Sequence, residues 1–367
     1  MRGGARWRLQ RAATVLARVF HRPLVPLLLG AYLLLRRAAV GTGQVLDRLF
    51  WPGLRAPVTD PVVIVGNPRS GTTFLHRFLG SHGLGSAQPL IRLLVPSLTL
   101  QALLRPFLPA LERFSPARFH AAAAHETSLT SAEADDVSLM FHFVDGFFLY
   151  GFILAFDDED HQDLFRPDVR DTDARDFRYW EGIWRRGRLA DRSARVLPKL
   201  FSLGARAPAF FRRFPEGKII YMVRDPLETI PSGMSLVTTV LHGAFGFWSL
   251  PDDVRRRYLD RLYQGLVALM LRWTEDWQQG HIPRDRVLIV RYDRMMSDFS
   301  SVMSEIFTFL GEQPSPALAE EITALAARQR AYKSRHTYDL ARFGLDEARI
   351  RQDCAAFYER WLPSPAT

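Results

Sequence analysis

Cysteine and lysine are both scarce in this sequence. Among 367 residues the only cysteine is Cys354, so neither an internal disulfide nor a cysteine-rich zinc cluster can form. Lysine occurs three times, at Lys199, Lys218 and Lys333, and arginine supplies the rest of the 48 basic residues. A single cysteine fits a reducing compartment, so we expect a cytoplasmic protein.

The sequence also lacks the signatures of nucleic-acid binding proteins, since no Cys/His cluster or RNA-recognition motif accompanies its basic residues. We therefore predict no nucleic-acid partner. The net charge of +9 instead favours an anionic ligand, such as a phosphorylated cofactor, or an anionic membrane face. A hydrophobic content of 47% is ample for a large core.

One apolar run stands out near the N-terminus, where residues 1–57 form a basic and apolar segment. The run Pro23–Leu35 is 13 residues long and is closed by Arg36 and Arg37. It is shorter than the roughly 20 residues that a spanning helix needs. Three interpretations stay open: peripheral contact with the inner face of a membrane, a helix covered by protein, and a true anchor.

The rest of the chain, residues 58–367, alternates between strand and helix patterns. Strands are predicted at Val62–Val65, Lys218–Val223 and Arg286–Tyr292, with a shorter one at Arg195–Leu197, and helices at Thr72–Ser81, Val254–Gln279 and Phe299–Leu310. This alternation predicts an α/β fold in which a central parallel sheet is flanked by helices. Residues from about 84 to 180 are interpreted as a helical insertion, whose aromatic stretch Phe141–Phe152 either builds an acceptor pocket or fills a helical core.

After the first predicted strand, the segment Gly66–Thr73 (GNPRSGTT) has almost the pattern of a nucleotide-binding phosphate loop. Thr72 replaces the lysine that reaches the β- and γ-phosphates in nucleoside triphosphatases. Backbone N–H groups at the start of the following helix can still hold one anion. With the hydroxyls of this loop and the charge of Arg69, it suits a 5′-phosphate that carries one further anionic group.

Two motifs resemble those of sulfotransferases that use 3′-phosphoadenosine 5′-phosphosulfate (PAPS). PRSGTTFL at 68–75 is similar to the family's 5′-phosphosulfate loop, and MVRDPLETIPSGMSL at 222–236 resembles its 3′-phosphate motif. Weaker similarity occurs in VLIVRYDRM at 287–295 and in YKSRHTYDLARFGL at 332–345, the latter typical of the bacterial-type branch. The resemblance covers about residues 60–360 and implies the P-loop-like three-layer fold of that family.

The resemblance also implies a cofactor and its ligands. PAPS would be the sulfuryl donor, 3′,5′-adenosine bisphosphate the product, and no metal would be needed. The implied cofactor-binding residues are Arg69, Ser70, Gly71, Thr72, Thr73, Arg224 and Ser232, with Lys333 and Arg335 in place of an absent Arg-Lys-Gly loop. Arg69 stands where cytosolic animal enzymes have lysine. Because arginine keeps its proton, it is predicted to act catalytically through its charge alone.

The general base is less clearly marked. His125 and Glu126 are the first candidates, and the others are His76, Glu133, Asp135 and Asp136. Thr130–Glu133 also matches a capping box, which would give Glu133 a structural role. The acceptor is predicted to be a hydroxyl or amine of a small molecule, lipid or glycan. The alternatives are a non-catalytic nucleotide-binding protein of the same fold and a P-loop kinase.

Overall fold

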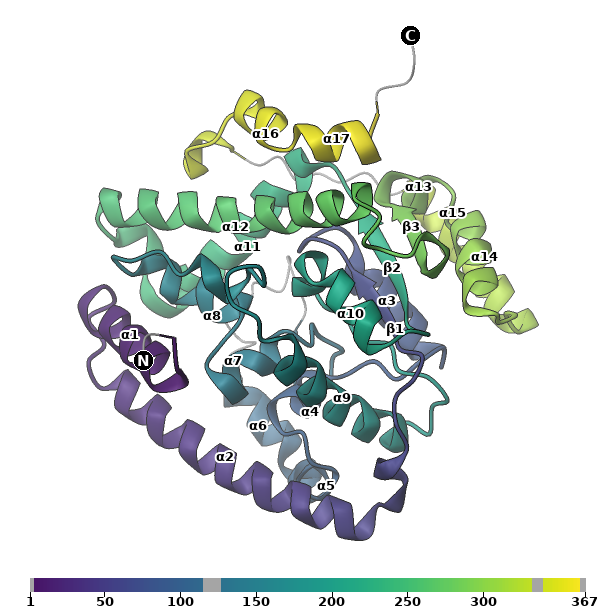
Figure 1. Ribbon diagram of the computed structural model, residues 1–367, viewed down its shortest axis with the longest axis horizontal. Helices are drawn as coiled ribbons and strands as arrows, with labels where there is room; N and C mark the ends of the chain where they lie inside the picture. The colour runs from purple at the N-terminus through teal and green to yellow at the C-terminus, as the bar shows by residue number, and fades with distance from the viewer. Residues whose placement is uncertain (1–2, 115–126, 332–338, 364–367) are drawn as a thin grey trace.

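The computed structural model describes residues 3–114, 127–331 and 339–363. At its centre lies a parallel sheet with the order β1-β2-β3, formed by Val62–Val65, Lys218–Val223 and Val287–Arg291 (Figure 1). The register places Val63 opposite Ile219, and Ile219 opposite Val287. The predicted α/β fold with a central parallel sheet is confirmed, and the three main strands lie where the sequence predicts them to within one residue.

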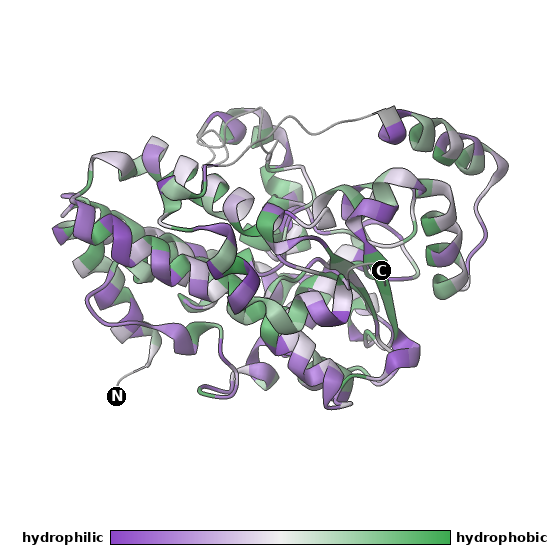
Figure 2. Cartoon of the chain, turned by 90° about the horizontal axis from the view of Figure 1, so that it is seen from above, coloured by the Kyte–Doolittle hydropathy of each residue, from purple (hydrophilic) through white to green (hydrophobic). Residues whose placement is uncertain are grey.

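Both faces of the sheet are buried, as continuous apolar strands require. Alternate side chains of β1 and β2 enter two separate cores, so Ile64 belongs to one and Val63 to the other. The strands are accordingly hydrophobic along their length (Figure 2). The core on the Ile64 side contains side chains of helices α3 (Thr72–Ser81), α13 (Tyr292–Ser297), α14 (Phe299–Leu310) and α15 (Pro316–Ala331).

The other core is larger and contains many aromatic residues. Its helices include α9 (Asp173–Ala190), α10 (Ala207–Arg213), α11 (Pro226–Phe245), α12 (Asp252–Gln278), α16 (Glu347–Asp353) and α17 (Ala355–Trp361). Tyr221 of β2 stacks on Trp273 of α12 with 3.9 Å between ring centroids. This stacking packs α12 against that face of the sheet.

Short helices follow α3 and precede α9. They are α4 (Leu90–Leu94), α5 (Leu98–Leu104), α6 (Leu108–Phe114), α7 (Val137–Phe143) and α8 (Phe147–Phe152). Single 3₁₀ turns separate or follow several of the helices, at Pro52–Arg55, Arg105–Phe107, Leu154–Phe156, Gln162–Leu164, Ser202–Ala205, Phe247–Ser249, Arg284–Arg286 and Ala341–Phe343. Phe147 is buried, and the aromatic stretch therefore contributes to the core.

Two helices precede the sheet, α1 (Ala5–Arg18) and α2 (Val25–Phe50), and α2 runs along one edge of the molecule (Figure 1). Residues 25–35 of the predicted apolar run therefore form only the first part of a 26-residue helix. One side of α2 packs on α1, α5 and α7. There Asp47 accepts a 2.8 Å hydrogen bond from Arg186 of α9 and two more from the backbone at the start of α5.

The predicted fourth strand at Arg195–Leu197 is wrong. This part of the chain runs beside β1, with an isolated bridge between Ile64 and Lys199, and Val196 forms a second isolated bridge with Ser86, but no continuous ladder forms. Pro198 explains the interruption, because proline has no N–H group to donate to a neighbouring strand. The segment nevertheless brings Lys199 beside the end of β1. The third strand is also one residue shorter at each end than predicted, and Tyr292 already belongs to α13.

Candidate active site

The phosphate-loop-like segment connects β1 to α3, and two glycines determine its shape. Gly66 has φ 151° and Gly71 has φ 93°, in the region that favours glycine. A Cβ on Gly66 would lie 2.8 Å from the carbonyl oxygen of Met222, and one on Gly71 would lie 2.8 Å from the Tyr292 ring. Glycine at these two positions therefore lets the loop pack closely against Met222 and Tyr292 where it enters α3.

Arg69 is held in an unusual backbone conformation within this loop. Its φ is 73°, which costs a residue with a side chain roughly 1–2 kcal/mol. Its Nε donates a 2.9 Å hydrogen bond to the Ser232 hydroxyl of α11. A strained arginine where glycine would fit more easily points to a need for the charged side chain at this position.

Arg224 follows β2 and joins the same cluster. Its guanidinium donates a 2.9 Å hydrogen bond to the carbonyl oxygen of Arg69 and lies 3.9 Å above the Tyr292 ring. It is also paired with Glu228 at 2.6 Å, although the Glu228 side chain is 55% exposed, so this pair is weak. The two motifs singled out in the sequence thus meet, since Arg69 contacts Ser232 directly and Arg224 through its backbone.

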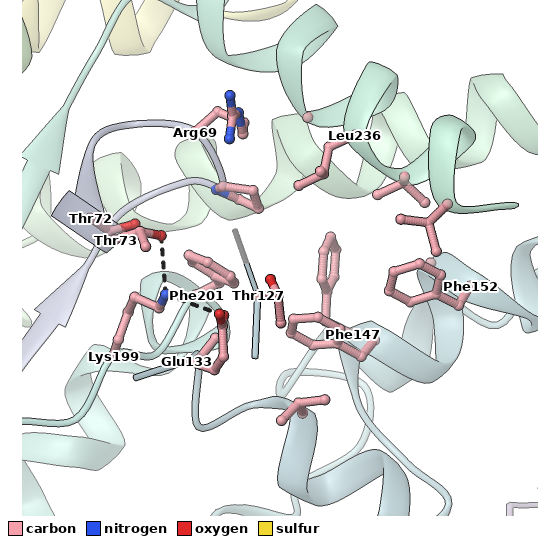
Figure 3. Close-up of a pocket in the computed structure, with 18 of the residues that line it drawn as sticks. Arg69, Thr72, Thr73, Thr127, Glu133, Phe147, Phe152, Lys199, Phe201 and Leu236 are labelled. Carbon is pink, nitrogen blue, oxygen red and sulfur yellow. Dashed lines mark hydrogen bonds and ion pairs between the residues drawn. The ribbon is translucent and has the colours of Figure 1, made fainter. Parts of the chain in front are cut away.

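Lys199 is a site residue that the sequence analysis missed. Its side chain is only 1% exposed, and its Nζ donates a 3.1 Å hydrogen bond to the Thr73 hydroxyl at the start of α3 (Figure 3). Burial lowers the pKa of Lys199, although the nearby Glu133 carboxylate opposes this effect. A lysine from a segment more than a hundred residues away therefore lies beside the loop, which has no lysine of its own.

Glu133 lies on the opposite side of Lys199. Its carboxylate is 3.9 Å from the Lys199 ammonium and accepts a 2.9 Å hydrogen bond from Arg77 of α3. The predicted capping box is wrong, because no helix begins at residues 130–133 and the next one starts only at Val137. Glu133 instead faces the cavity beside the loop (Figure 3).

The other candidate bases, His76, Asp135 and Asp136, are all buried and hydrogen-bonded to the backbone. His76 does not face the site: it is fully buried, contacts the carbonyl oxygen of Leu197 at 2.8 Å, and burial lowers its pKa to about 3. Asp135 and Asp136 are buried acceptors for backbone N–H groups, at Lys199 for the first and at Phe201 and Ser202 for the second. Burial raises the pKa of Asp135 to about 7.

Four predicted site residues lie outside the described parts of the chain. They are the base candidates His125 and Glu126 and the cofactor candidates Lys333 and Arg335. Thr127, which directly follows the first pair, lines the cavity (Figure 3). Leu325, Arg328 and Gln329 of α15, whose last residue is Ala331, line it as well.

The cavity beside these residues has a volume of about 940 Å³, at the upper end of the roughly 300–1,000 Å³ usual for ligand pockets. Its polar end is formed by Arg69, Thr72, Thr73, Glu133, Lys199 and Arg224. The remaining wall is mostly apolar and is drawn from α1, α2, α4, α7, α8, α11, α12, α13 and α15, although it also includes Thr127, Arg328 and Gln329. Phe147, Phe152 and Leu236 lie across this cavity from Lys199 (Figure 3).

Comparison with known proteins assigns the family. The sulfotransferase family model matches residues 61–316, so the chain belongs to the sulfotransferase family. The fold resembles the sulfotransferase STF1 from Mycobacterium tuberculosis H37Rv, with a TM-score of 0.68 and 17% identity over 96% of this chain and 91% of that chain. It also resembles the sulfotransferase STF9 from Mycobacterium avium, with a TM-score of 0.62 and 18% identity over 98% and 86% of the two chains. Comparison with curated proteins finds no match.

Proposed function

We propose that this sulfotransferase uses PAPS as its donor and transfers the sulfuryl group to a hydroxyl or amine of a small molecule, lipid or glycan. The observation that carries the proposal is the cluster at the N-terminus of α3, where Arg69 contacts Ser232 and Arg224 contacts the backbone of Arg69. Two guanidinium groups and a helix N-terminus at one place favour a ligand with more than one anionic group.

The residues present fit such a donor. Gly66 and Gly71 allow the loop to pack against Met222 and Tyr292, because a Cβ at either position would collide with these neighbours. The N–H groups and hydroxyls of Ser70–Thr73 would hold the 5′-phosphate, and Arg224 with Ser232 would hold the 3′-phosphate. Lys333 and Arg335 stay proposed as further ligands of that phosphate. Arg224 would exchange its ion pair with Glu228 for one with the phosphate, because the Glu228 side chain is exposed and the pair is weak.

PAPS supplies an activated sulfuryl group, whose bond from sulfur to the 5′-phosphate oxygen breaks as the acceptor oxygen or nitrogen bonds to sulfur. Arg69 and Lys199 would neutralise the negative charge that the departing phosphate oxygen gains. Lys199 suits this role because its ammonium is hydrogen-bonded to Thr73 and shielded from water, where solvent screens its charge less.

The acceptor must lose its proton to a base. We propose His125 and Glu126 as candidates, and the position of Glu133 at the cavity wall adds a third. Glu133 is paired with two cations, Arg77 and Lys199, so its removal tests two roles at once: proton acceptor and partner of Lys199. Glu133→Gln, His125→Ala and Glu126→Gln should be compared by kcat and by its dependence on pH.

The direct test of the donor is thermal unfolding with 3′,5′-adenosine bisphosphate, AMP or magnesium-ATP. A ligand at about 100 times its Kd stabilises the protein by about 2.7 kcal/mol. We expect a shift of that size with the bisphosphate, a smaller one with AMP, and none with the bisphosphate in Arg224→Ala. Stabilisation by magnesium-ATP but not by the bisphosphate would refute the proposed donor and favour a kinase.

A further inference from the structure

The apolar part of the cavity points to an acceptor that carries a hydrocarbon chain. Beyond the polar end, the wall includes Leu16 of α1, Leu29 and Leu33 of α2 and Val240 of α11. A chain in this space would be removed from water while its polar head reached Glu133 and Lys199 at the other end. The two N-terminal helices, which precede the region matched by the family model, therefore form part of the acceptor site.

Helix α2 has a second apolar face, which the protein does not cover. Leu27, Leu28, Leu34 and Leu35 are each at least 67% exposed, and Val45 and Leu49 continue the same face further along the helix. Leu29 and Leu33, which line the cavity, lie on the opposite side of the helix. Helix α2 therefore separates the acceptor cavity from an exposed apolar surface, which we call the outer face of α2.

Positive charge flanks the outer face. Among residues 1–56 the only acidic residue is Asp47, and it is buried against Arg186. A second cavity of about 320 Å³ beside the C-terminal half of α2 is lined by Arg48, Arg178, Arg185, Arg186, Arg213 and Glu181. Arg185 and Arg213 are paired with Glu181 and Arg186 with Asp47, and Arg48 and Arg178 are exposed. An apolar face bordered by arginines complements a bilayer surface that carries anionic headgroups.

We propose, on the basis of the proposed sulfuryl transfer, that the outer face of α2 docks on an anionic lipid bilayer and that the cavity behind it binds the hydrocarbon chain of a hydroxyl- or amine-bearing lipid. The shared helix supplies the connection: its outer face contacts the membrane, and its inner face contacts the acceptor drawn from that membrane. The acceptor head then lies beside Lys199 and Glu133, and the chain lies between α1, α2 and α11.

Helix α2 is long and apolar enough to cross a membrane by length and composition, but its polar contacts favour a position along the surface. Arg36 donates hydrogen bonds to the carbonyl oxygens of Leu94 and Phe141, and Asp47 is paired with Arg186. If α2 crossed the bilayer, Arg36 and Asp47 would lose these partners within the hydrocarbon region, at a large cost in free energy.

Docking is tested by flotation of the full chain with vesicles of phosphatidylcholine containing 30% phosphatidylglycerol, and with pure phosphatidylcholine vesicles. We expect binding to the anionic vesicles, weakening with salt, and a loss of at least tenfold in the variant with Leu27, Leu28, Leu34 and Leu35 all changed to Gln. Val169→Gln, at an exposed apolar residue outside the N-terminal helices, is the matched control and should bind as the wild type does.

Charge is tested separately with Arg48→Gln and Arg178→Gln, each expected to weaken binding about fivefold. Equal flotation of the wild type and the fourfold variant would overturn the docking. A dimer in vesicle-free buffer that the fourfold variant converts to a monomer, with no flotation of either, would assign the outer face to a second copy of the chain and also overturn it.

The chain site is tested without turnover, by thermal unfolding and calorimetric titration with 1-dodecanol, 1-octanol and 1-butanol in the presence of 3′,5′-adenosine bisphosphate. Affinity should rise roughly threefold to fourfold per methylene group until the cavity is filled. Leu33→Trp, which fills the space from the α2 side, should abolish dodecanol binding and leave the bisphosphate shift unchanged. Affinity that does not increase with chain length would overturn the lipid site, whereas absence of the bisphosphate shift would refute the proposed donor instead.

Discussion

The two ends of the cavity are built in different ways. At the polar end, the charged side chains follow extended segments of the chain. Arg69 comes shortly after β1, Arg224 directly after β2, and Lys199 lies at a bridge with β1. At the apolar end, the wall is formed by aliphatic and aromatic side chains from several helices. Charged groups act at single positions, and an apolar surface acts through its total area. Substitutions at the two ends should therefore have different kinetic consequences.

The largest effect is expected for Lys199→Met, which keeps the length of the side chain and removes its charge. We expect kcat to fall about 10²-fold to 10³-fold, because a preorganised cation beside the transferred group is lost. The bisphosphate shift should change little. Lys218→Met is the matched control, since the Lys218 ammonium is bonded to the carbonyl oxygen of Phe309 away from the site. Equal losses in both variants would remove Lys199 from the catalytic site.

Lys199 should also determine how kcat depends on pH. Burial lowers the pKa of Lys199 from its usual 10.5, so its ammonium loses its proton at a lower pH than an exposed lysine would. If kcat needs that charge, kcat should fall on the alkaline side at a pH below 10.5. Measured kcat–pH profiles should show this fall in the wild type, and Lys199→Met should have a low kcat without it. An alkaline fall retained in Lys199→Met would assign it to another group.

Arg69→Gly should separate turnover from stability. Glycine relieves the cost of the positive φ but removes the guanidinium and its hydrogen bond to Ser232. We expect kcat to fall about 10²-fold while the melting temperature in the absence of ligand stays within about 2 °C of the wild type. The same experiment with Arg192→Gly, at another positive-φ arginine, is the control for backbone effects. A large loss of stability in Arg69→Gly would make the residue structural.

A smaller effect is expected at the apolar end, where Leu236→Ala removes one wall contact on α11. The lost apolar area should weaken dodecanol binding about tenfold and leave the bisphosphate shift unchanged. Calorimetric titration measures both ligands in one preparation. If the bisphosphate is weakened as much as the alcohol, the two ends of the cavity are not independent.

The smallest effect, in the opposite direction, is expected for Glu228→Gln. Glu228 pairs with Arg224 at 2.6 Å and would compete with a 3′-phosphate for it. Its removal should tighten bisphosphate binding about twofold to fivefold, in keeping with the low strength of exposed ion pairs. AMP, which lacks the 3′-phosphate, should bind unchanged. Weaker bisphosphate binding would indicate that Glu228 orients Arg224.

Several features could be predicted from the sequence because each depends on neighbouring residues. The strand Val62–Val65 and the helix Thr72–Ser81 were predicted with the bounds that the structure has, since an apolar β-branched run and helical spacing are local signals. The predicted fourth strand is interrupted at Pro198. The predicted capping box is wrong because residues 131–133 pair with residues 88–90 instead of starting a helix.

Lys199 could not have been assigned from spacing. The only signal in the sequence was that lysine is rare: Lys199 is one of three lysines, and it follows a short apolar run. Its role at Thr73 depends on a bridge between Ile64 and Lys199, a contact across more than a hundred residues. The same holds for Glu133, whose contacts with Arg77 and Lys199 join parts of the chain that no local pattern relates.

The sequence by itself determined the α/β class, the loop between β1 and α3 and the arginine and serine of its second motif, because these follow from local periodicity and from fixed spacings. Tertiary structure alone decided that Lys199 lies beside Thr73 of the loop, that His76 is buried outside the cavity, and that the N-terminal helices form part of the cavity wall. The physical reason is that a buried charge and an apolar wall both need partners from separate segments, and only packing brings those segments together.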